Sequence, residues 1–136
     1  MSNTVIDKKT ETHKFGGWIA SESVTTTISL VNMGDGKFGL SYDSKFSGVK
    51  DGHVQGGPFA VDGNKNIKVH SSPDVHLTIS KFDKTSSTIS MNVDITVDIP
   101  VLGTKTIFDQ TLSGTYAAAA GWVAAAASIK QKSAGI

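Results

Sequence analysis

The sequence predicts an all-β fold, a single-domain antiparallel β-sandwich of seven or eight strands. Three features support this prediction: an unbroken polar/apolar alternation over Thr88–Ile99, further segments rich in β-branched residues, and turn signals between the segments. Side chains on an extended backbone point alternately to opposite faces, so a two-residue period fits a half-buried strand and no helix. Many short strands joined by turns are typical of antiparallel sheets, and the absence of a repeat favours two packed sheets.

The alternating segment is the clearest element of the chain. At about 3.3 Å per residue it would extend roughly 40 Å, well beyond an average strand. Residues 75–82 also alternate, and the polar residues 83–87 connect the two segments, so we expect a hairpin over residues 75–99. The apolar face of the longer strand consists of Ile89, Met91, Val93, Ile95, Val97 and Ile99.

The other expected elements follow from the same signals. Residues 24–32 and 38–43 form a hairpin around Asp35-Gly36, because this dipeptide tolerates positive φ. Weaker strands are expected at 15–19, 58–61, 67–70 and 104–112, and the glycine-rich residues 45–57 form either a long loop or an edge strand. The polar residues 1–12 are expected to be a flexible tail that precedes the domain, residues 13–136.

The C-terminal segment has a different composition. Alanine dominates residues 116–132, and alanine is the strongest helix former. We expect a helix packed on one end or edge of the sandwich, although Gly121 weakens it and a closing strand is the alternative.

Composition excludes several classes of function. The chain has 136 residues and no cysteine, which excludes disulfides and thiolate chemistry. Its basic residues are all lysine, interleaved with acidic residues, which argues against nucleic-acid binding. The four histidines lack metal-ligand spacing, and no serine lies in a nucleophile elbow, so we expect neither an enzyme nor a metal or other cofactor. No signal peptide or transmembrane helix is apparent, so we expect a soluble protein, cytoplasmic as synthesised or released by a leaderless route.

The tryptophans suggest a binding function. Trp18 follows Gly16-Gly17 and Trp122 follows Gly121, and a glycine neighbour leaves one side of an indole uncovered. Such rings either stack on sugars, anchor at lipid interfaces or fill a core next to a glycine. We therefore expect a binding or assembly protein for a carbohydrate or a lipid headgroup. The candidate ligand contacts are Trp18, Trp122, Tyr42, Asp35 and Asn64, near the loop residues 34–37, 48–57 and 62–66.

Two alternatives remain open. A lipid-crossing β-strand needs about 9–11 residues of alternating pattern, so a membrane-active, pore-forming type of protein could oligomerise and insert the 75–99 hairpin through Ile89, Met91, Val93, Ile95 and Val97. A structural subunit could instead form homo-oligomers through exposed edge strands. The polar face of the long strand carries Asp94 and Asp98, which are about 13 Å apart along one strand and therefore too far apart to share one calcium ion.

Overall fold

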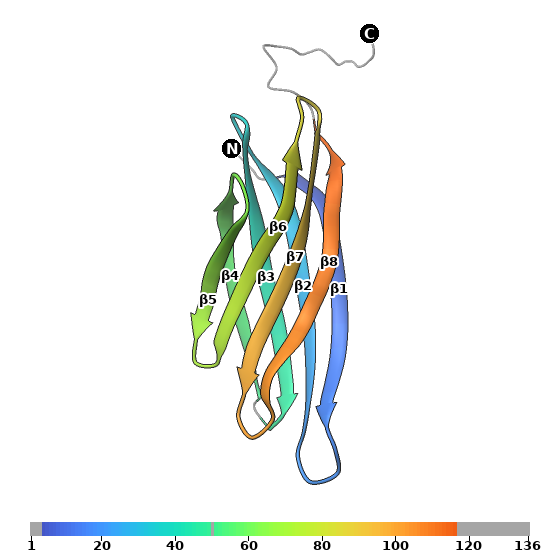
Figure 1. The fold of residues 1–136 in the computed structure, drawn as a ribbon, viewed down its shortest axis with the longest axis vertical. Helices are drawn as coiled ribbons and strands as arrows, with labels where there is room; N and C mark the ends of the chain where they lie inside the picture. The colour runs from blue at the N-terminus through green and yellow to red at the C-terminus, as the bar shows by residue number, and fades with distance from the viewer. Residues whose placement is uncertain (1–3, 50, 117–136) are drawn as a thin grey trace.

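The computed structural model describes residues 4–49 and 51–116, which form two four-stranded antiparallel sheets. The strands are β1 (Thr4–Gly16), β2 (Ser21–Gly34), β3 (Lys37–Gly48), β4 (Gly52–Val61), β5 (Lys65–Ser71), β6 (Asp74–Lys84), β7 (Thr88–Ile99) and β8 (Gly103–Thr115). The first sheet has the order β1-β2-β3-β4 and the second the order β5-β6-β7-β8, so each strand pairs with its neighbour in sequence. The prediction of an all-β antiparallel sandwich is confirmed (Figure 1).

One hydrophobic core joins the two sheets. Every second residue of β7 is buried, as its two-residue period predicts. The inward faces of β2, β3 and β6 contribute apolar residues in the same way, and Phe108 of β8 is fully buried between the sheets. The expected hairpins at 24–43 and 75–99 are present, and most of their strands extend beyond the predicted bounds.

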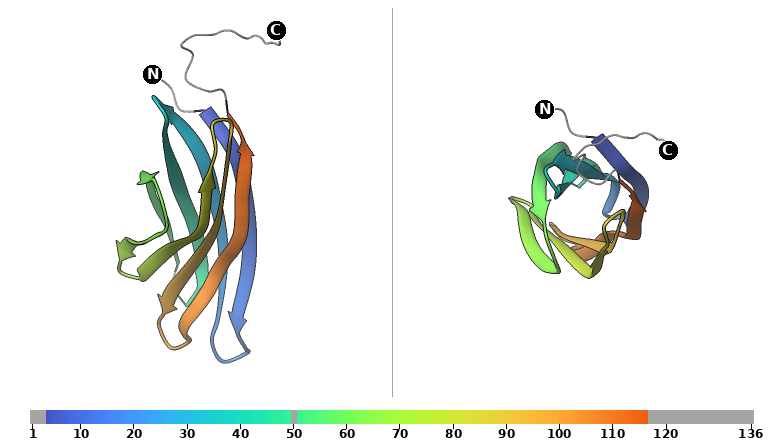
Figure 2. Two further views of the ribbon diagram at one scale, coloured as in Figure 1. Left: turned by 45° about the horizontal axis from the view of Figure 1, so that its top comes forward. Right: turned by 90° about the horizontal axis from the view of Figure 1, so that it is seen from above.

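The molecule is elongated, with different loops at its two ends (Figure 1). The turns that follow β2, β4 and β6 lie toward one end, together with the start of β1 and the end of β8; we call it the terminal end. The loops that follow β1, β3 and β7 lie at the opposite end, which we call the distal end. Viewed from above, the sheets curve around the core with β1 beside β8 (Figure 2).

Side chains close the edge between β1 and β8. No backbone ladder links these strands. Instead, alternate side chains of β1 satisfy alternate backbone groups of β8, which is one way of protecting a sheet edge. The three bonds are Asp109 N–H to Glu11 Oε2 at 2.9 Å, Ser113 N–H to Asp7 Oδ2 at 2.9 Å, and Lys9 Nζ to the Thr111 carbonyl at 3.3 Å.

Two segments differ from the sequence-based expectation. Residues 4–12, expected to belong to a flexible tail, are part of β1, and residues 17–19, expected to continue a strand from residue 15, lie in the loop after β1. Residues 52–57 are part of β4, an edge strand of the first sheet, which was one of the two expectations for residues 45–57. The pattern of β1 is hidden because its half-buried face carries Asp7, Lys9 and Glu11, whose partner is the edge of β8 and not the apolar core. The expected C-terminal helix lies outside the described residues, apart from Tyr116.

Candidate functional site

Three large apolar side chains are exposed at the distal end. Trp18 is 97 % exposed, and Ile19 and Val101 are each 86 % exposed. They come from two loops, residues 17–20 after β1 and residues 100–102 after β7, which together line a shallow concavity of about 310 Å³. We call Trp18, Ile19 and Val101 the apolar tip. Isolated apolar residues are common on protein surfaces, but a group at one end indicates an interaction site.

Tight turns project the tip away from the sheets. In the first loop, Gly17 N–H donates to the Ala20 carbonyl at 2.8 Å. Gly16 has φ +88°, and a Cβ at this position would collide with the Ala20 carbonyl oxygen, so the turn requires glycine. Trp18 and Ile19 lie inside this turn, and both side chains are exposed.

The second loop holds its valine in a strained conformation. Leu102 N–H donates to the Ile99 carbonyl at 3.1 Å, and Val101 between them has φ +74°. This region is unfavourable for a β-branched residue, at a cost of about 1–3 kcal/mol. A strained backbone that presents an apolar side chain to water is a feature expected at a functional site.

The base of the tip is polar and charged. The half-buried Phe15 ring lies 5.8 Å from the stacked His13 ring, and Lys105 Nζ lies 5.9 Å from its centroid. Lys14 is exposed on β1 beside the first loop. Asp98 accepts a hydrogen bond from the Thr104 hydroxyl next to the second loop. Apolar side chains at the tip and charges three or four residues away along the chain give the distal end an amphipathic character.

The tip offers little hydrogen-bonding chemistry. Its concavity is lined by Trp18, Ile19, Val101, Leu102 and the small residues Gly16, Gly17 and Ala20. The indole N–H is the only polar side-chain group among them. Elsewhere in the described part of the chain, no group of three histidine or carboxylate side chains is arranged to hold a metal ion. Over the same residues, no helix is long and apolar enough to cross a membrane.

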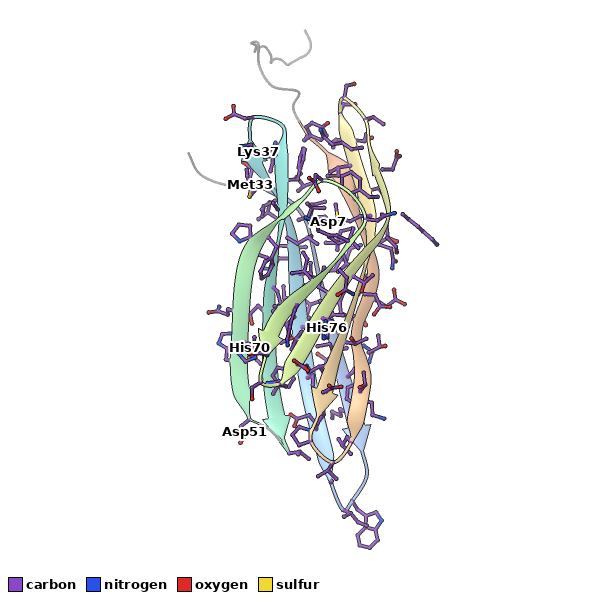
Figure 3. The ribbon with its side chains drawn as sticks, turned by 60° about the vertical axis from the view of Figure 1, so that its left-hand side comes forward. Asp7, Met33, Lys37, Asp51, His70 and His76 are labelled. Atoms are coloured by element: carbon purple, nitrogen blue, oxygen red, sulfur yellow. The ribbon has the colours of Figure 1, made fainter. Side chains whose placement is uncertain are left out.

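The other predicted contact residues do not lie beside Trp18. Asp35 is exposed in the β2–β3 turn and Asn64 lies in the β4–β5 turn, both toward the terminal end, where Figure 3 also labels Lys37. Asn64 Oδ1 accepts a hydrogen bond from Phe82 N–H at 2.9 Å. Tyr42 is a core residue, 2 % exposed, and burial raises its pKa to about 12. Trp122 lies outside the described residues.

The predicted loop set also does not form one surface. Residues 34–37 and 62–66 lie at or near turns toward the terminal end, whereas residues 48–57 begin at the distal end and continue into β4. Figure 3 labels Asp51 at the distal end, opposite Met33 and Lys37. Sequence reasoning missed Ile19 and Val101 as site residues. Apolar residues inside turn segments were the available signal, because turns are normally polar.

The candidate membrane-inserting residues form the buried face of β7. Ile89, Met91, Val93, Ile95 and Val97 are each at most 1 % exposed. Insertion of the 75–99 hairpin would therefore require separation of the two sheets and loss of the core.

The adjacent strands β7 and β8 bring together two carboxylates that sequence reasoning did not pair. Asp94 lies directly opposite Asp109 of β8, and Asn92 Nδ2 donates to Asp109 Oδ1 at 3.2 Å. Burial and the neighbouring charge of Asp109 both raise the pKa of Asp94. The repulsion between these two carboxylates lowers the stability of the folded protein.

Comparisons with known proteins give no relative. No protein-family model matches the chain, and searches of curated proteins and of solved structures return no significant match.

Proposed function

We propose that this protein is a non-enzymatic binding protein that attaches to the surface of a lipid membrane through its apolar tip. The observation that carries the proposal is the near-complete exposure of Trp18, Ile19 and Val101 on adjacent loops at one end of a rigid β-scaffold. Tryptophan is enriched at membrane–water interfaces, where its ring meets lipid and its N–H stays hydrated.

The energetics of the tip fit reversible attachment. Burying one large apolar side chain yields about 1.5–3 kcal/mol, so the three residues together supply about 6 kcal/mol. That free energy corresponds to a dissociation constant between the millimolar and the micromolar range. The nearby Lys14 and Lys105 can approach lipid phosphates while their aliphatic stems follow the apolar surface.

A sugar is a weaker match to the tip than lipid is. Recognition of a sugar ring needs several hydrogen-bonding groups around the site, and the lining of the tip has none besides the indole N–H. The candidate polar contacts Asp35 and Asn64 lie toward the other end of the molecule. A stable protein–protein interface usually needs about 20–30 residues on each side, far more than this tip supplies.

Edge-to-edge assembly is not favoured by the strands that would form it. The free edge of β4 is interrupted by a register shift at Gly57-Pro58, and proline cannot donate to a ladder. β5 is short and carries Lys65 and Lys68. Short strands, lysines, prolines and bulges are the features by which natural edges avoid pairing.

The proposal is tested by vesicle flotation. The full chain is mixed with vesicles of phosphatidylcholine alone and of phosphatidylcholine with phosphatidylserine. We expect the protein to float with at least one of these, and more with the anionic mixture if the lysines near the tip contribute. Protein that stays at the bottom of the gradient with both compositions would overturn the proposal.

A further inference from the structure

We infer that the outer face of the first sheet carries a second site, a polar depression that binds a neutral sugar residue. The depression has a volume of about 530 Å³ and extends across all four strands, β1 to β4. Its lining includes the side chains of Lys8, Thr27, Ser29, Ser41, Asp43 and Gln55. The site is separate from the apolar tip and does not depend on membrane binding.

The depression is hollow because β4 lacks side chains there. The pairing of β3 with β4 is irregular between Leu40 and Tyr42, so Ser41 has no single partner on β4. Gly57, in the irregular part of β4, has φ +95°, and a Cβ at this position would lie only 2.5 Å from the Leu40 carbonyl oxygen. A side chain is therefore excluded beside Ser41, and the sequence Gly56-Gly57-Pro58 acquires a structural role.

Two serine hydroxyls form the floor of the depression. Ser29 of β2 and Ser41 of β3 are direct cross-strand partners, and both are half-buried. Side chains in this relation lie roughly 5 Å apart. Within residues 4–49 and 51–116, neither hydroxyl forms a hydrogen bond, whereas the Thr27 hydroxyl beside them is bonded to the Thr10 hydroxyl at 2.9 Å. The two serines are thus free to donate to and accept from a ligand.

A carboxylate is held in place at one side of the floor. Asp43 follows two residues after Ser41 and therefore points to the same face. Its Oδ1 lies 2.7 Å from His53 Nε2, and its Oδ2 accepts a hydrogen bond from Gln55 Nε2 at 3.2 Å. Each carboxylate oxygen keeps a further lone pair. The neighbouring strand thus fixes the orientation of Asp43 before any ligand arrives, which lowers the entropic cost of binding.

The charges around the depression select for a neutral ligand. Lys8 pairs with Ser29 in the register and forms no ion pair among the residues that the structure describes. Lys8 and Asp43 give one positive and one negative charge, so neither a simple anion nor a simple cation is favoured. A sugar hydroxyl both donates and accepts, and it can use the ammonium, the carboxylate and the serine hydroxyls together. The depression therefore suits an uncharged polyhydroxylated ring.

The test is a titration of the isotopically labelled full chain, followed by amide chemical shifts. The probes are glucose, galactose, mannose and N-acetylglucosamine, each at millimolar concentration, with glycine betaine as a zwitterionic comparison. We expect at least one sugar to shift the amides of Ser29, Ser41 and Gln55 in a saturable way. Failure of all four sugars to do so, or a response to betaine alone, would overturn the inference.

Matched variants locate the binding. Ser41→Tyr fills the depression, and Ser47→Tyr places the same ring on the same face of β3 near the distal end. We expect sugar affinity to fall about tenfold or more in the first variant, as for the loss of about 1.4 kcal/mol, and to stay unchanged in the second. Asp43→Asn keeps the shape of the site and removes its charge, so it replaces Ser41→Tyr if that protein does not fold. If the Asp43→Asn and Ser41→Tyr variants bind sugar with the affinity of the wild type, the sugar binds outside the depression and the inference is overturned.

Discussion

Replacing Trp18 by alanine should weaken attachment to lipid vesicles without affecting the fold. The side chain is 97 % exposed, so its removal leaves no cavity in the protein. Surface substitutions of this kind usually change the free energy of unfolding by no more than about 0.5 kcal/mol. Any large loss of binding would therefore reflect the contact with lipid and not a loss of folded protein.

The size of the effect follows from the area of the indole ring. A tryptophan side chain presents about 150–250 Å², and at about 25 cal/mol per Å² its complete dehydration is equivalent to about 4–6 kcal/mol. A ring at the interface loses roughly half of its water contacts, and alanine retains a small share, which leaves a difference of about 2 kcal/mol. Since about 1.4 kcal/mol is a factor of ten, the partition coefficient should fall about thirtyfold.

The assay is the vesicle flotation described above, combined with the emission of Trp18. The chain has two tryptophans, so a Trp122→Phe background leaves Trp18 as the only indole. Its emission should shift to the blue when vesicles are added. Val101→Ala at the tip should weaken binding by several-fold, whereas Val5→Ala should not, since Val5 is 56 % exposed but lies at the terminal end.

Two results would refute the reasoning. One is equal partitioning of the Trp18→Ala variant and the wild type, which would remove the tip as the membrane contact. The other is equal weakening by Val5→Ala and Val101→Ala, because general surface hydrophobicity would then explain the binding. A concentration-dependent mass in light scattering without lipid would instead indicate that the tip joins copies of the protein.

Two further predictions concern the carboxylates of Glu11 on β1, which bonds to the edge of β8, and of Asp94 on β7. Burial raises the pKa of Glu11, but hydrogen bonds from Asp109 N–H and from the His13 and Gln110 side chains, with the charge of His13, outweigh burial and lower it below its ordinary value of 4.5. The ionised Glu11 therefore stabilises the fold above pH 4.5, and this stabilisation is lost as the pH falls through the lower folded-state pKa. Glu11→Gln should lower the free energy of unfolding by about 1 kcal/mol in denaturant at neutral pH, and the variant should lose less stability than the wild type on acidification. An unchanged dependence of stability on acid pH would contradict this prediction. The pKa of Asp94 is raised by burial and by the charge of Asp109. Ionisation of Asp94 therefore lowers the stability of the fold as the pH rises above the ordinary pKa of an aspartate. Asp94→Asn should stabilise the protein at neutral pH by about 0.5 kcal/mol, and a lower thermal midpoint of the variant would contradict this prediction.

Local sequence patterns were sufficient to predict much of the fold. β7 begins and ends at the predicted residues, because its alternation is uninterrupted and Pro100 follows directly. The hairpin around Asp35-Gly36 was equally readable, since the turn chemistry and the flanking β-branched residues agree. β1 could not be predicted, because its half-buried side chains are polar. Their hydrogen bonds are to the backbone of β8, which is distant in the sequence.

The candidate sites were only partly predictable. The glycines beside Trp18 suggested an uncovered ring, but the sequence was interpreted as a strand over residues 15–19, whereas the structure places Trp18 in a tight turn after β1. That Val101 joins it, while Asp35 and Asn64 lie toward the other end, depends on the direction of each strand in the sheets. The polar depression likewise depends on register, because Ser29 and Ser41 are separated by a turn and become partners only through the β2–β3 ladder.

The sequence by itself determined that the chain forms antiparallel strands with one apolar and one polar face, since side-chain alternation is a local property of an extended backbone. Tertiary structure decided which residues meet across strands and which loops share an end. Those relations are set by the pairing of β1 with β2, by the closure of β1 onto β8, and by the common core of the two sheets. They arise from contacts between residues distant in the chain, and a pattern read along the sequence does not contain them.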